Sequence, residues 1–357
     1  MVETDIRLSI IIPIYNGEKY LDRLGASIRK FSTGQVEILL IDDGSLDKSL
    51  EKCRKFVEIW PFVKVFSKEN GGIADTRNYG MKQARGTYLC FMDQDDEIVM
   101  EICMKALEKA EKTQADACLW SSERAFENGT KAKNVTFQQE RLYDETEIRG
   151  ALLAQYLRKE PSEKIFHIPG YVWSGLYRNE FLRNHEIHFF SFVDYEDDCI
   201  FMNQVMRWAK KLMILPDVGY YWTCNLQSES HRIKYIDHLW EKKMRLREWF
   251  QNSVYDIFEA QKPPREQLEK ENAIWIYEYI ENICSIKNPA SNRAIIREMR
   301  VFFQNKEHFA WILQEKEPYG GAGGRRKMMH SLLVKKWYPA VLVWLRLYEK
   351  ISITRKG

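Results

Sequence analysis

The stretch Cys90-Phe91-Met92-Asp93-Gln94-Asp95-Asp96 ends an apolar run and places three carboxylates within four residues. Such a sequence is typical of a buried strand that ends at a polar site. Neighbouring carboxylates raise one another's pKa, and a divalent cation removes that conflict. Because Mg2+ and Mn2+ prefer oxygen ligands and Mg2+ usually takes some from phosphates, the stretch predicts a site for a metal and a diphosphate. The structural alternative is a turn in which Asp95 or Asp96 caps a helix that begins near Glu97.

The length and composition describe a globular protein with more than one domain. The chain has 357 residues, of which 45% are hydrophobic, so we expect a core domain with an extension. The net charge of +3 argues against nucleic acid as a partner. The seven cysteines are odd in number and form no Cys-x-x-Cys pair, which is typical of buried thiols in a reducing compartment. A mixed, charged segment opens the chain where a signal peptide would be apolar, and we expect a cytoplasmic protein.

Apolar runs alternate with helical patterns in the first part of the chain. Residues 8–14 and 36–41 are nearly unbroken apolar runs, typical of strands buried on both faces of a parallel sheet. The other predicted strands cover residues 63–66, 88–92, 117–120 and 211–215. The predicted helices cover residues 18–30, 47–59, 73–84 and 97–112. This alternation predicts an α/β fold, with a mostly parallel sheet flanked by helices and a ligand site at the carboxyl ends of the strands.

Three polar clusters follow predicted strands of that sheet. They are Pro13-Ile14-Tyr15-Asn16-Gly17-Glu18, Asp42-Asp43-Gly44-Ser45 and Asp93-Gln94-Asp95-Asp96. Because the carboxyl ends of parallel strands meet at one edge, we expect the clusters to converge. A carboxylate of the second cluster can accept a hydrogen bond from a flat base such as uracil, and Tyr15 can stack on that base.

A glycine turn and a helix start follow the second cluster. Asn70-Gly71-Gly72 allows the backbone to approach a ligand closely. Arg77 and Asn78 come one helical turn later and can reach a phosphate or a ribose. The structural alternatives are an ordinary turn for the glycines and a surface charge for Arg77.

The second part of the chain carries an aromatic segment and a further acidic run. Residues 170–177, with the sequence GYVWSGLY, are rich in aromatic side chains. The run Tyr195-Glu196-Asp197-Asp198 opens a predicted helix, and its acids either include a general base or complement the helix dipole. The polar residues 227–232 form a predicted loop that can fold over phosphates.

The chain is helical beyond residue 235 and ends in a basic segment. Residues 325–357 hold nine Lys or Arg against one acid, Glu349, and they alternate with apolar side chains such as Trp337 and Trp344. The apolar part is too short for a bilayer span of about 20 residues. It suits a helix that lies on an anionic membrane surface, and the alternatives are an oligomerisation helix or a helix packed on the core. Pro339 is expected to kink this segment or to start a second helix.

Together these motifs resemble those of family 2 of the inverting glycosyltransferases, which have the GT-A fold. The matching motifs are residues 9–16 (SIIIPIYN), 41–45 (IDDGS), 69–80 (ENGGIADTRNYG), 86–88 (GTY), 93–96 (DQDD) and 195–198 (YEDD). Thr76 departs from the alanine that is usual there. The resemblance covers residues 7–230. It implies a Rossmann-like catalytic domain over residues 1–232, followed by a helical extension over 233–320 and a basic amphipathic tail over 321–357.

The resemblance also implies roles for single residues. The residues expected to bind the donor are Pro13, Tyr15, Glu18, Asp42 or Asp43, Gly72, Arg77, Asn78 and Asp93. Asp95 is expected to hold Mn2+ or Mg2+, with Asp93 contacting the metal or the ribose. Within Glu196-Asp197-Asp198, Asp197 is the expected general base and Asp198 the other candidate. The aromatic residues 170–177 are expected to form a wall on the acceptor side.

The function implied is transfer of a sugar from a nucleotide-sugar, expected to be UDP-linked, to a hydroxyl of a lipid-linked or polymeric glycan of the cell surface. The basic tail adds an anionic membrane surface as a partner, so the expected location is peripheral on the inner face of the cell membrane. The helical C-terminal region also offers a contact for a homo-oligomer.

Two other functions agree less well with the sequence. A nucleotidyltransferase usually has a glycine-rich loop and a basic residue after the first strand, where this chain has Pro13-Ile14-Tyr15-Asn16. A catalytically silent, membrane-associated glycan-binding scaffold predicts that the acids are lost, yet all the acidic clusters are present.

Overall fold

The computed structural model describes residues 5–32, 34–126, 129–156, 168–192, 196–224, 235–254, 265–314 and 323–354. It divides into two compact units, residues 1–226 and 227–357. Tyr195 and the predicted phosphate loop at 227–232 lie outside the described residues.

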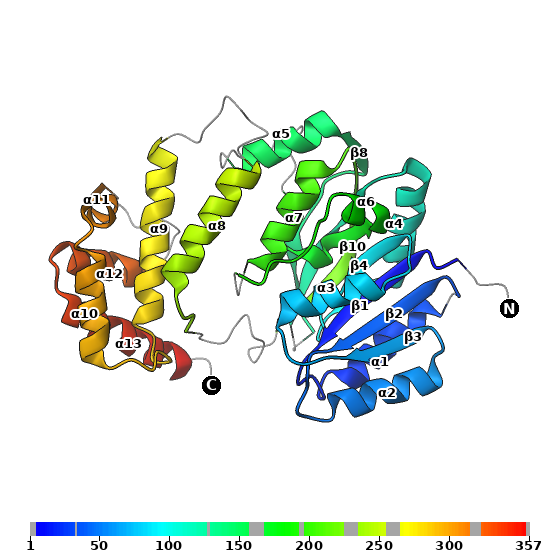
Figure 1. The fold of residues 1–357 in the computed structure, drawn as a ribbon, viewed down its shortest axis with the longest axis horizontal. Helices are drawn as coiled ribbons and strands as arrows, with labels where there is room; N and C mark the ends of the chain where they lie inside the picture. The colour runs from blue at the N-terminus through cyan, green and yellow to red at the C-terminus, as the bar shows by residue number, and fades with distance from the viewer. Residues whose placement is uncertain are drawn as a thin grey trace. The chain divides into compact units, whose positions relative to one another are not determined.

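The first unit is built on one sheet with the strand order β3-β2-β1-β4-β9-β6-β10-β5 (Figure 1). The bounds are β1 Leu8–Ile14, β2 Val36–Asp42, β3 Val63–Ser67, β4 Tyr88–Phe91, β5 Glu97–Ile98, β6 Ala117–Phe126, β7 Lys131–Val135, β8 Arg141–Asp144, β9 Gly175–Arg178 and β10 Lys211–Cys224. Strands β1 to β4 are parallel, and so is the pair β6 and β10. Strands β5, β7, β8 and β9 pair antiparallel to their neighbours.

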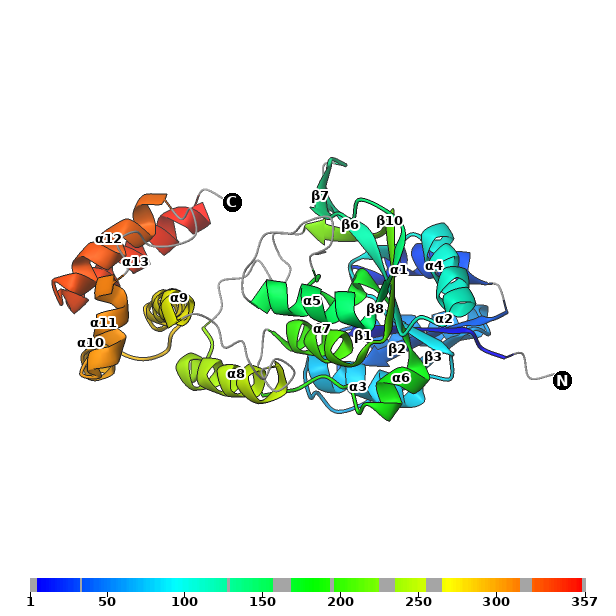
Figure 2. The same cartoon turned by 90° about the horizontal axis from the view of Figure 1, so that it is seen from above.

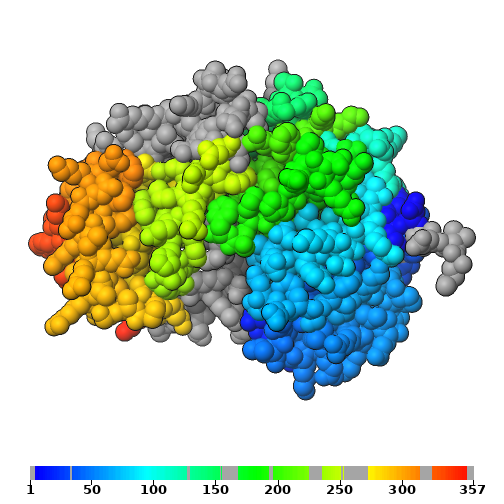
Figure 3. All heavy atoms as spheres, viewed as in Figure 1, coloured from blue at the N-terminus to red at the C-terminus, as the bar shows by residue number. Residues whose placement is uncertain are grey.

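Helices cover both faces of this sheet. The bounds are α1 Leu21–Ile28, α2 Ser49–Ile59, α3 Ile73–Gln83, α4 Met100–Thr113, α5 Glu145–Tyr156, α6 Asn179–Asn184 and α7 Asp197–Trp208, with short 3-10 turns η1 Arg29–Phe31 and η2 Val172–Ser174. Seen along the sheet, α1 and α4 lie on one side and α3 and α7 on the other (Figure 2). Figure 3 shows the blue to cyan segments of this unit packed into one body.

Alternating strand residues explain the two layers of helices. Successive side chains of a strand point to opposite faces. Ile10 and Ile12 belong to one core cluster with Leu24 of α1 and Leu107 of α4. On the opposite face Gly80 allows α3 to lie directly on β1, because a Cβ at Gly80 would come within 2.4 Å of an Ile11 side-chain carbon.

The fold confirms the predicted α/β class with a helical C-terminal extension. Every predicted strand is present, and the predicted buried cysteines Cys90, Cys118 and Cys284 are 0% exposed. The helix predicted to begin at Glu97 begins instead at Met100, because residues 97 and 98 pair with β10. Strand β10 continues to Cys224 rather than ending at 215. A bulge between Leu215 and Val218 accommodates Pro216, and proline in a sheet is tolerated at such irregularities.

The second unit is helical in its described part. Its helices are α8 Leu239–Val254, α9 Arg265–Ile283, α10 Asn292–Phe302, α11 Lys306–Gln314, α12 Gly323–Val334 and α13 Tyr338–Thr354. Pro339 stands in the first turn of α13, where its missing N–H has no intrahelical partner to lose. It therefore starts a second helix, one of the two expected effects. No helix in the described residues is long and apolar enough to cross a membrane.

Candidate active site

The three polar clusters predicted at the carboxyl edge of the sheet converge there. The backbone N–H of Tyr15 donates to Oε1 of Gln94 at 3.1 Å, and the amide of Gln94 donates back to the Tyr15 carbonyl at 3.1 Å. Asn16 N–H donates to Oγ of Ser45 at 3.0 Å, and Glu18 N–H donates to Asp47 at 3.0 Å. These bonds tie the loops after β1, β2 and β4 to one another. The predicted convergence is therefore confirmed.

The acids after β2 are buried and hold the surrounding loops. Asp43 is 4% exposed and accepts hydrogen bonds at 2.9 Å from the backbone N–H groups of Gly71 and Gly72. Gly72 has φ of +84°, which favours glycine. Burial raises the pKa of Asp43, but the bonds from Lys68 and Gly71 outweigh it and hold that pKa below the usual value. The N–H of Gly72 thus supports Asp43 in this structure.

The other predicted pocket residues lie around the same loops. Asp42 is 1% exposed and accepts from Ser67 Oγ at 2.9 Å. Pro13 is buried in β1, whereas the side chain of Tyr15 is 44% exposed. Glu18 accepts from the backbone N–H of Lys48 at 3.3 Å. Tyr15 is therefore the exposed ring of this group that can meet a base.

Arg77 joins the acids after β4 to the acids at the start of α7. It is 4% exposed, so the predicted alternative of a surface charge is wrong. One terminal nitrogen lies 3.0 Å from Oδ1 of Asp93, and the other lies 3.1 Å from Oδ2 of Asp197 and also contacts Asp198. A single guanidinium thereby holds three carboxylates, one from the loop after β4 and two from the first turn of α7.

One positive charge does not neutralise three negative ones. Burial raises the pKa of Asp198 to about 7, although Arg77 opposes the shift, and the nearby charges of Asp197 and Asp93 add to it. Burial and the charge of Asp93 raise the pKa of Asp95 to about 6. Several acids with shifted pKa values in one place indicate a functional site.

Asn78 has a structural role that differs from its predicted contact with the donor. Its side-chain amide donates to the carbonyl of Phe189 at 2.8 Å, and its oxygen accepts from the N–H of Phe189 at 2.8 Å. Phe189 in turn lies 5.3 Å from the guanidinium of Arg77. Asn78 therefore holds the segment that packs on Arg77.

Three stacked rings run outward from the acidic loop. The hydroxyl of Tyr220 accepts from the N–H of Asp93 at 3.1 Å and donates to Asp96 at 2.7 Å. Trp173 stacks on Tyr220 with ring centres 4.4 Å apart, and Tyr171 stacks on Trp173 at 4.8 Å. Tyr171 is 41% exposed, so the stack has a buried end and an open end.

Comparison with known proteins assigns these motifs to a family. Residues 9–170 match the model of glycosyl transferase family 2. The chain carries a family 2 glycosyltransferase domain. The acids Asp197 and Asp198 lie beyond the matched residues.

Relatives and solved structures agree with this family. EpsJ of Bacillus subtilis, an uncharacterized glycosyltransferase, is 28% identical over 214 residues, which cover 60% of this chain and 60% of EpsJ. The minor teichoic acid biosynthesis protein GgaB of Bacillus subtilis is 41% identical over 91 residues, 25% of this chain and 10% of GgaB. S. aureus TarS 1–349 in complex with UDP-GlcNAc aligns with a TM-score of 0.57 at 19% identity, over 97% of this chain and 92% of that one. The likeness to TarS shows the shared GT-A fold.

The three carboxylates of the acidic loop in this glycosyltransferase domain, Asp93, Asp95 and Asp96, have different surroundings. Asp96 is 2% exposed and also accepts from the N–H of Thr223 at 2.7 Å, so it anchors the loop to β10. The predicted helix cap is wrong for Asp95 and Asp96, because α4 has Val99 at its N-cap position and no side-chain cap. Within the described residues, no three His, Cys, Asp or Glu side chains gather as a metal cluster.

The carboxylates that remain fit a cation that shares a diphosphate. Asp93 uses one oxygen for Arg77 and has a side chain that is 34% exposed, while Asp95 sits beside it with a raised pKa. Mg2+ is commonly held by one or two carboxylates together with substrate phosphates and water, rather than by a protein cage. Two under-compensated acids therefore suit this kind of ion.

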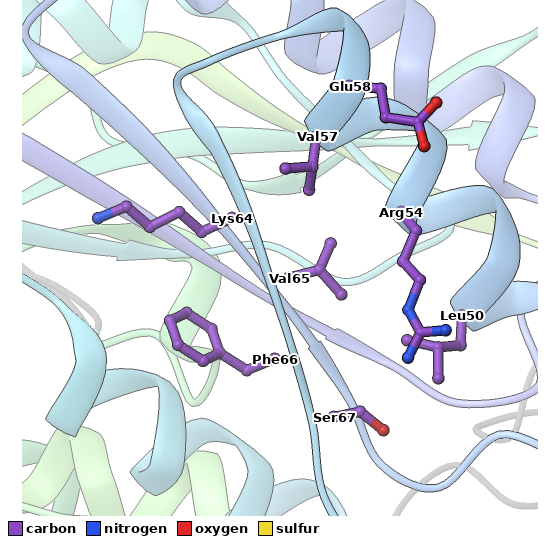
Figure 4. Close-up of a pocket in the computed structure, with 8 residues that line it drawn as sticks. All are labelled: Leu50, Arg54, Val57, Glu58, Lys64, Val65, Phe66 and Ser67. Atoms are coloured by element: carbon purple, nitrogen blue, oxygen red, sulfur yellow. The ribbon is translucent and has the colours of Figure 1, made fainter.

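A surface pocket of the same domain lies elsewhere. It is lined by Leu50, Arg54, Val57, Glu58, Lys64, Val65, Phe66 and Ser67 of α2 and β3 (Figure 4). None of these residues is one of the predicted site acids.

Sequence reasoning missed some of the residues and contacts that build the glycosyltransferase site. Lys68 and Tyr220 were not predicted, and Gln94 and Asp96 were predicted as members of the acidic cluster without the hydrogen bonds that they make. Gln94 and Asp96 lie inside the acidic motif, so their position in the sequence already indicated that they belong to the site. Lys68 and Tyr220 had no such signal, because their partners lie far away in the sequence.

Proposed function

We propose that this chain is an inverting, metal-dependent glycosyltransferase that transfers a sugar from a UDP-linked donor to a hydroxyl of a lipid-linked or polymeric glycan. The observation that carries this proposal is Arg77, which holds Asp93 of the expected donor side and Asp197 of the expected acceptor side in one site. A transfer enzyme needs both partners at one place, because positioning lowers the barrier of the reaction.

Asp197 is the proposed general base. Its Oδ2 is bound to Arg77, and its Oδ1 has no hydrogen bond from the described residues. Both oxygens of Asp198 are engaged, one by Arg77 and one by the N–H of Val172 at 3.3 Å. Asp197 thus has an oxygen available for a proton, while Glu196, at the N-cap position of α7, is proposed to support it.

The proposed step is a single displacement. The acceptor oxygen forms a bond to the anomeric carbon while its proton moves to Asp197. The bond between that carbon and the diphosphate oxygen breaks, and its electron pair stays on the departing diphosphate. Because attack and departure occur on opposite faces, the anomeric centre is inverted.

The leaving diphosphate is proposed to lie at the loop that contains Asp93 and Asp95. These two residues would hold Mg2+ or Mn2+, and that ion would neutralise charge on the diphosphate. Tyr15 is proposed to stack on the base. Asp42, Asp43, Gly72, Pro13 and Glu18 are proposed to shape the donor pocket through the loops that they hold.

The relatives and the aromatic stack support a proposal for the class of acceptor. TarS has been crystallised with UDP-GlcNAc, and GgaB takes part in minor teichoic acid biosynthesis. We propose a surface polysaccharide or its lipid-linked precursor as the acceptor. The open face of Tyr171 would pack against an acceptor sugar, because aromatic rings offer a large and rigid contact area.

The proposal is tested by a screen of nucleotide sugars. Release of nucleoside diphosphate is measured with Mn2+ and with a chelator, first without and then with glycan acceptors. We expect metal-dependent release of UDP from one donor, and an inverted anomeric signal in the product by NMR. Release of pyrophosphate would instead indicate a nucleotidyltransferase. Absence of binding to every nucleotide sugar would favour a silent scaffold.

A further inference from the structure

Helix α13 has two apolar faces. Val341, Leu342 and Leu345 are at most 3% exposed and belong to the core of the second unit. Val343, Leu347 and Ile351 are 67%, 51% and 44% exposed. Residues four apart lie on the same side of a helix, so these three form one stripe over about two turns. A helix that only packs on its own unit needs one apolar face.

The acid of this segment and its arginines are used for internal contacts. Glu349 accepts from Ser285 Oγ and from the N–H of Ile286, both at 3.0 Å. Arg326 lies 3.3 Å from Glu281, and Arg346 donates to Asn292 at 2.6 Å. These contacts fix the orientation of α12 and α13 within the unit. They also leave the exposed side of the two helices without an acid.

The exposed charges on α12, on α13 and in the turn between them are lysines. Lys327, Lys335, Lys336 and Lys350 are exposed, and the side chain of Trp337 between the helices is 58% exposed. The ammonium of Lys335 lies 5.4 Å from the centre of the Trp337 ring. Exposed lysine and tryptophan combined with an exposed apolar stripe are the composition of helices that lie in a membrane interface.

We propose that this surface, which we call the α13 face, binds the anionic surface of a lipid bilayer. The stripe of the α13 face consists of Val343, Leu347 and Ile351, and we assign to the same face the exposed Trp337 and the four exposed lysines of α12, α13 and the turn between them. The stripe enters the boundary between headgroups and acyl chains, and the lysines lie on the negative headgroups. Charge complementarity favours lipid over a second copy of the chain, because a symmetric contact would place the same lysines near one another.

The experiment uses the full chain and vesicles. Sedimentation is compared for vesicles rich in phosphatidylglycerol and for vesicles of phosphatidylcholine alone, at low and high salt. We expect binding to the anionic vesicles that weakens with salt. The double variant Val343→Glu with Leu347→Glu should lower the partition coefficient at least about tenfold, because it places charge in the buried stripe. The variant Lys335→Gln with Lys336→Gln should reduce the preference for anionic lipid while keeping the stripe.

Matched controls come from the same unit. Val301 on α10 and Leu313 on α11 are 58% and 51% exposed, so Val301→Glu with Leu313→Glu adds the same charge outside the α13 face. This control should bind vesicles like the parent chain. Equal loss in the control, or no preference for anionic vesicles, overturns the proposal. So does a parent dimer that the Val343 and Leu347 changes convert to monomer without altering vesicle binding.

The inference does not depend on sugar transfer. Release of UDP from a soluble donor is measured on the same variants without vesicles and should equal that of the parent chain. Vesicle binding without UDP release would leave the α13 face in place and remove the proposed enzyme function. UDP release without vesicle binding would remove the proposed role of the α13 face and leave the proposed enzyme function in place.

Discussion

Glu37, near the start of β2, and the acids Asp95 and Asp198, beyond the carboxyl ends of the strands, have pKa values that move in opposite directions. Glu37, near the start of β2, accepts hydrogen bonds from Ser9 Oγ at 2.7 Å, Lys64 at 2.8 Å and the N–H of Arg85 at 2.8 Å. Burial raises the pKa of Glu37, but these donors outweigh it and the pKa is lowered. Beyond the carboxyl ends of the strands, burial and neighbouring charge raise the pKa of Asp95 and of Asp198.

The direction of the pKa shift distinguishes acids that stabilise the fold from acids whose charge a bound ligand would compensate. The hydrogen bonds and the positive charge that Glu37 receives stabilise its ionised form. Asp93, Asp197 and Asp198 share the single charge of Arg77, and Asp95 lies beside Asp93 with a raised pKa. A cation and a substrate would complete such a set.

Replacement of the proposed base should have the largest effect. Asp197→Asn removes the oxygen that takes the acceptor proton but keeps the size of the side chain. We expect the rate of sugar transfer to fall by about 100- to 10,000-fold. Asp198→Asn should cost less, because both of its oxygens are already engaged. Transfer rates with the donor found by the screen, at saturating donor, measure both effects.

Asp22→Asn is the control for these two variants, since Asp22 is an acid whose side chain is 83% exposed. It should leave the rate unchanged. A normal rate for Asp197→Asn together with a lost rate for Asp198→Asn would assign the base to Asp198 instead.

Removal of Arg77 should have the next largest effect. Arg77→Met deletes the only charge that the three acids share through direct ion pairs among the described residues. Breaking a buried ion-pair network typically costs about 3–5 kcal/mol, because the remaining charges are left uncompensated. Urea denaturation measures the loss in the free energy of unfolding.

The matched change Arg54→Met lies on the exposed side of α2 and should cost less than about 0.5 kcal/mol. Equal stabilities of the two variants would show that Arg77 does not hold the acids together in solution.

The sequence predicts where the site acids lie along the sheet, but it does not predict the ion pairs that connect them through Arg77. The acids at 42–43 and 93–96 follow apolar runs, and the rule for parallel strands places them at one edge. The ion pairs of Arg77 were not predicted, because its partners Asp93 and Asp197 lie 16 and 120 residues away along the chain. Short antiparallel strands such as β9 were missed for a related reason. Four residues carry too little periodicity, and their pairing depends on neighbours distant in the sequence.

Glu37→Gln should affect stability but not catalysis. The change keeps the shape of the side chain and removes the anion that Lys64 and Arg85 contact, so we expect a loss of about 1–3 kcal/mol in the free energy of unfolding. Because the folded pKa of Glu37 is lowered, its contribution is present above the unfolded value of about 4.3 and is lost as the pH falls through the folded value.

The variant should therefore differ most from the parent near neutral pH and converge with it in acid. A difference that grows in acid would contradict the lowered pKa. The transfer rate per folded molecule should be unchanged, because Glu37 lies at the opposite end of β2 from the acids of the site.

Asp95→Asn should have the smallest effect on stability and the opposite sign. The folded pKa of Asp95 is raised to about 6, above an unfolded value of about 3.9, so the favourable contribution of this acid is present only below the unfolded value and is lost as the pH rises through 6. At pH values above 6 the parent therefore carries a buried charge that asparagine removes. In chelator we expect the variant to be more stable by on the order of 1 kcal/mol, a gain that disappears in acid. Metal-dependent UDP release should fall in the same variant, since Asp95 is the proposed ligand. A variant that loses stability at all pH values would place Asp95 with Glu37, as an acid that holds the fold.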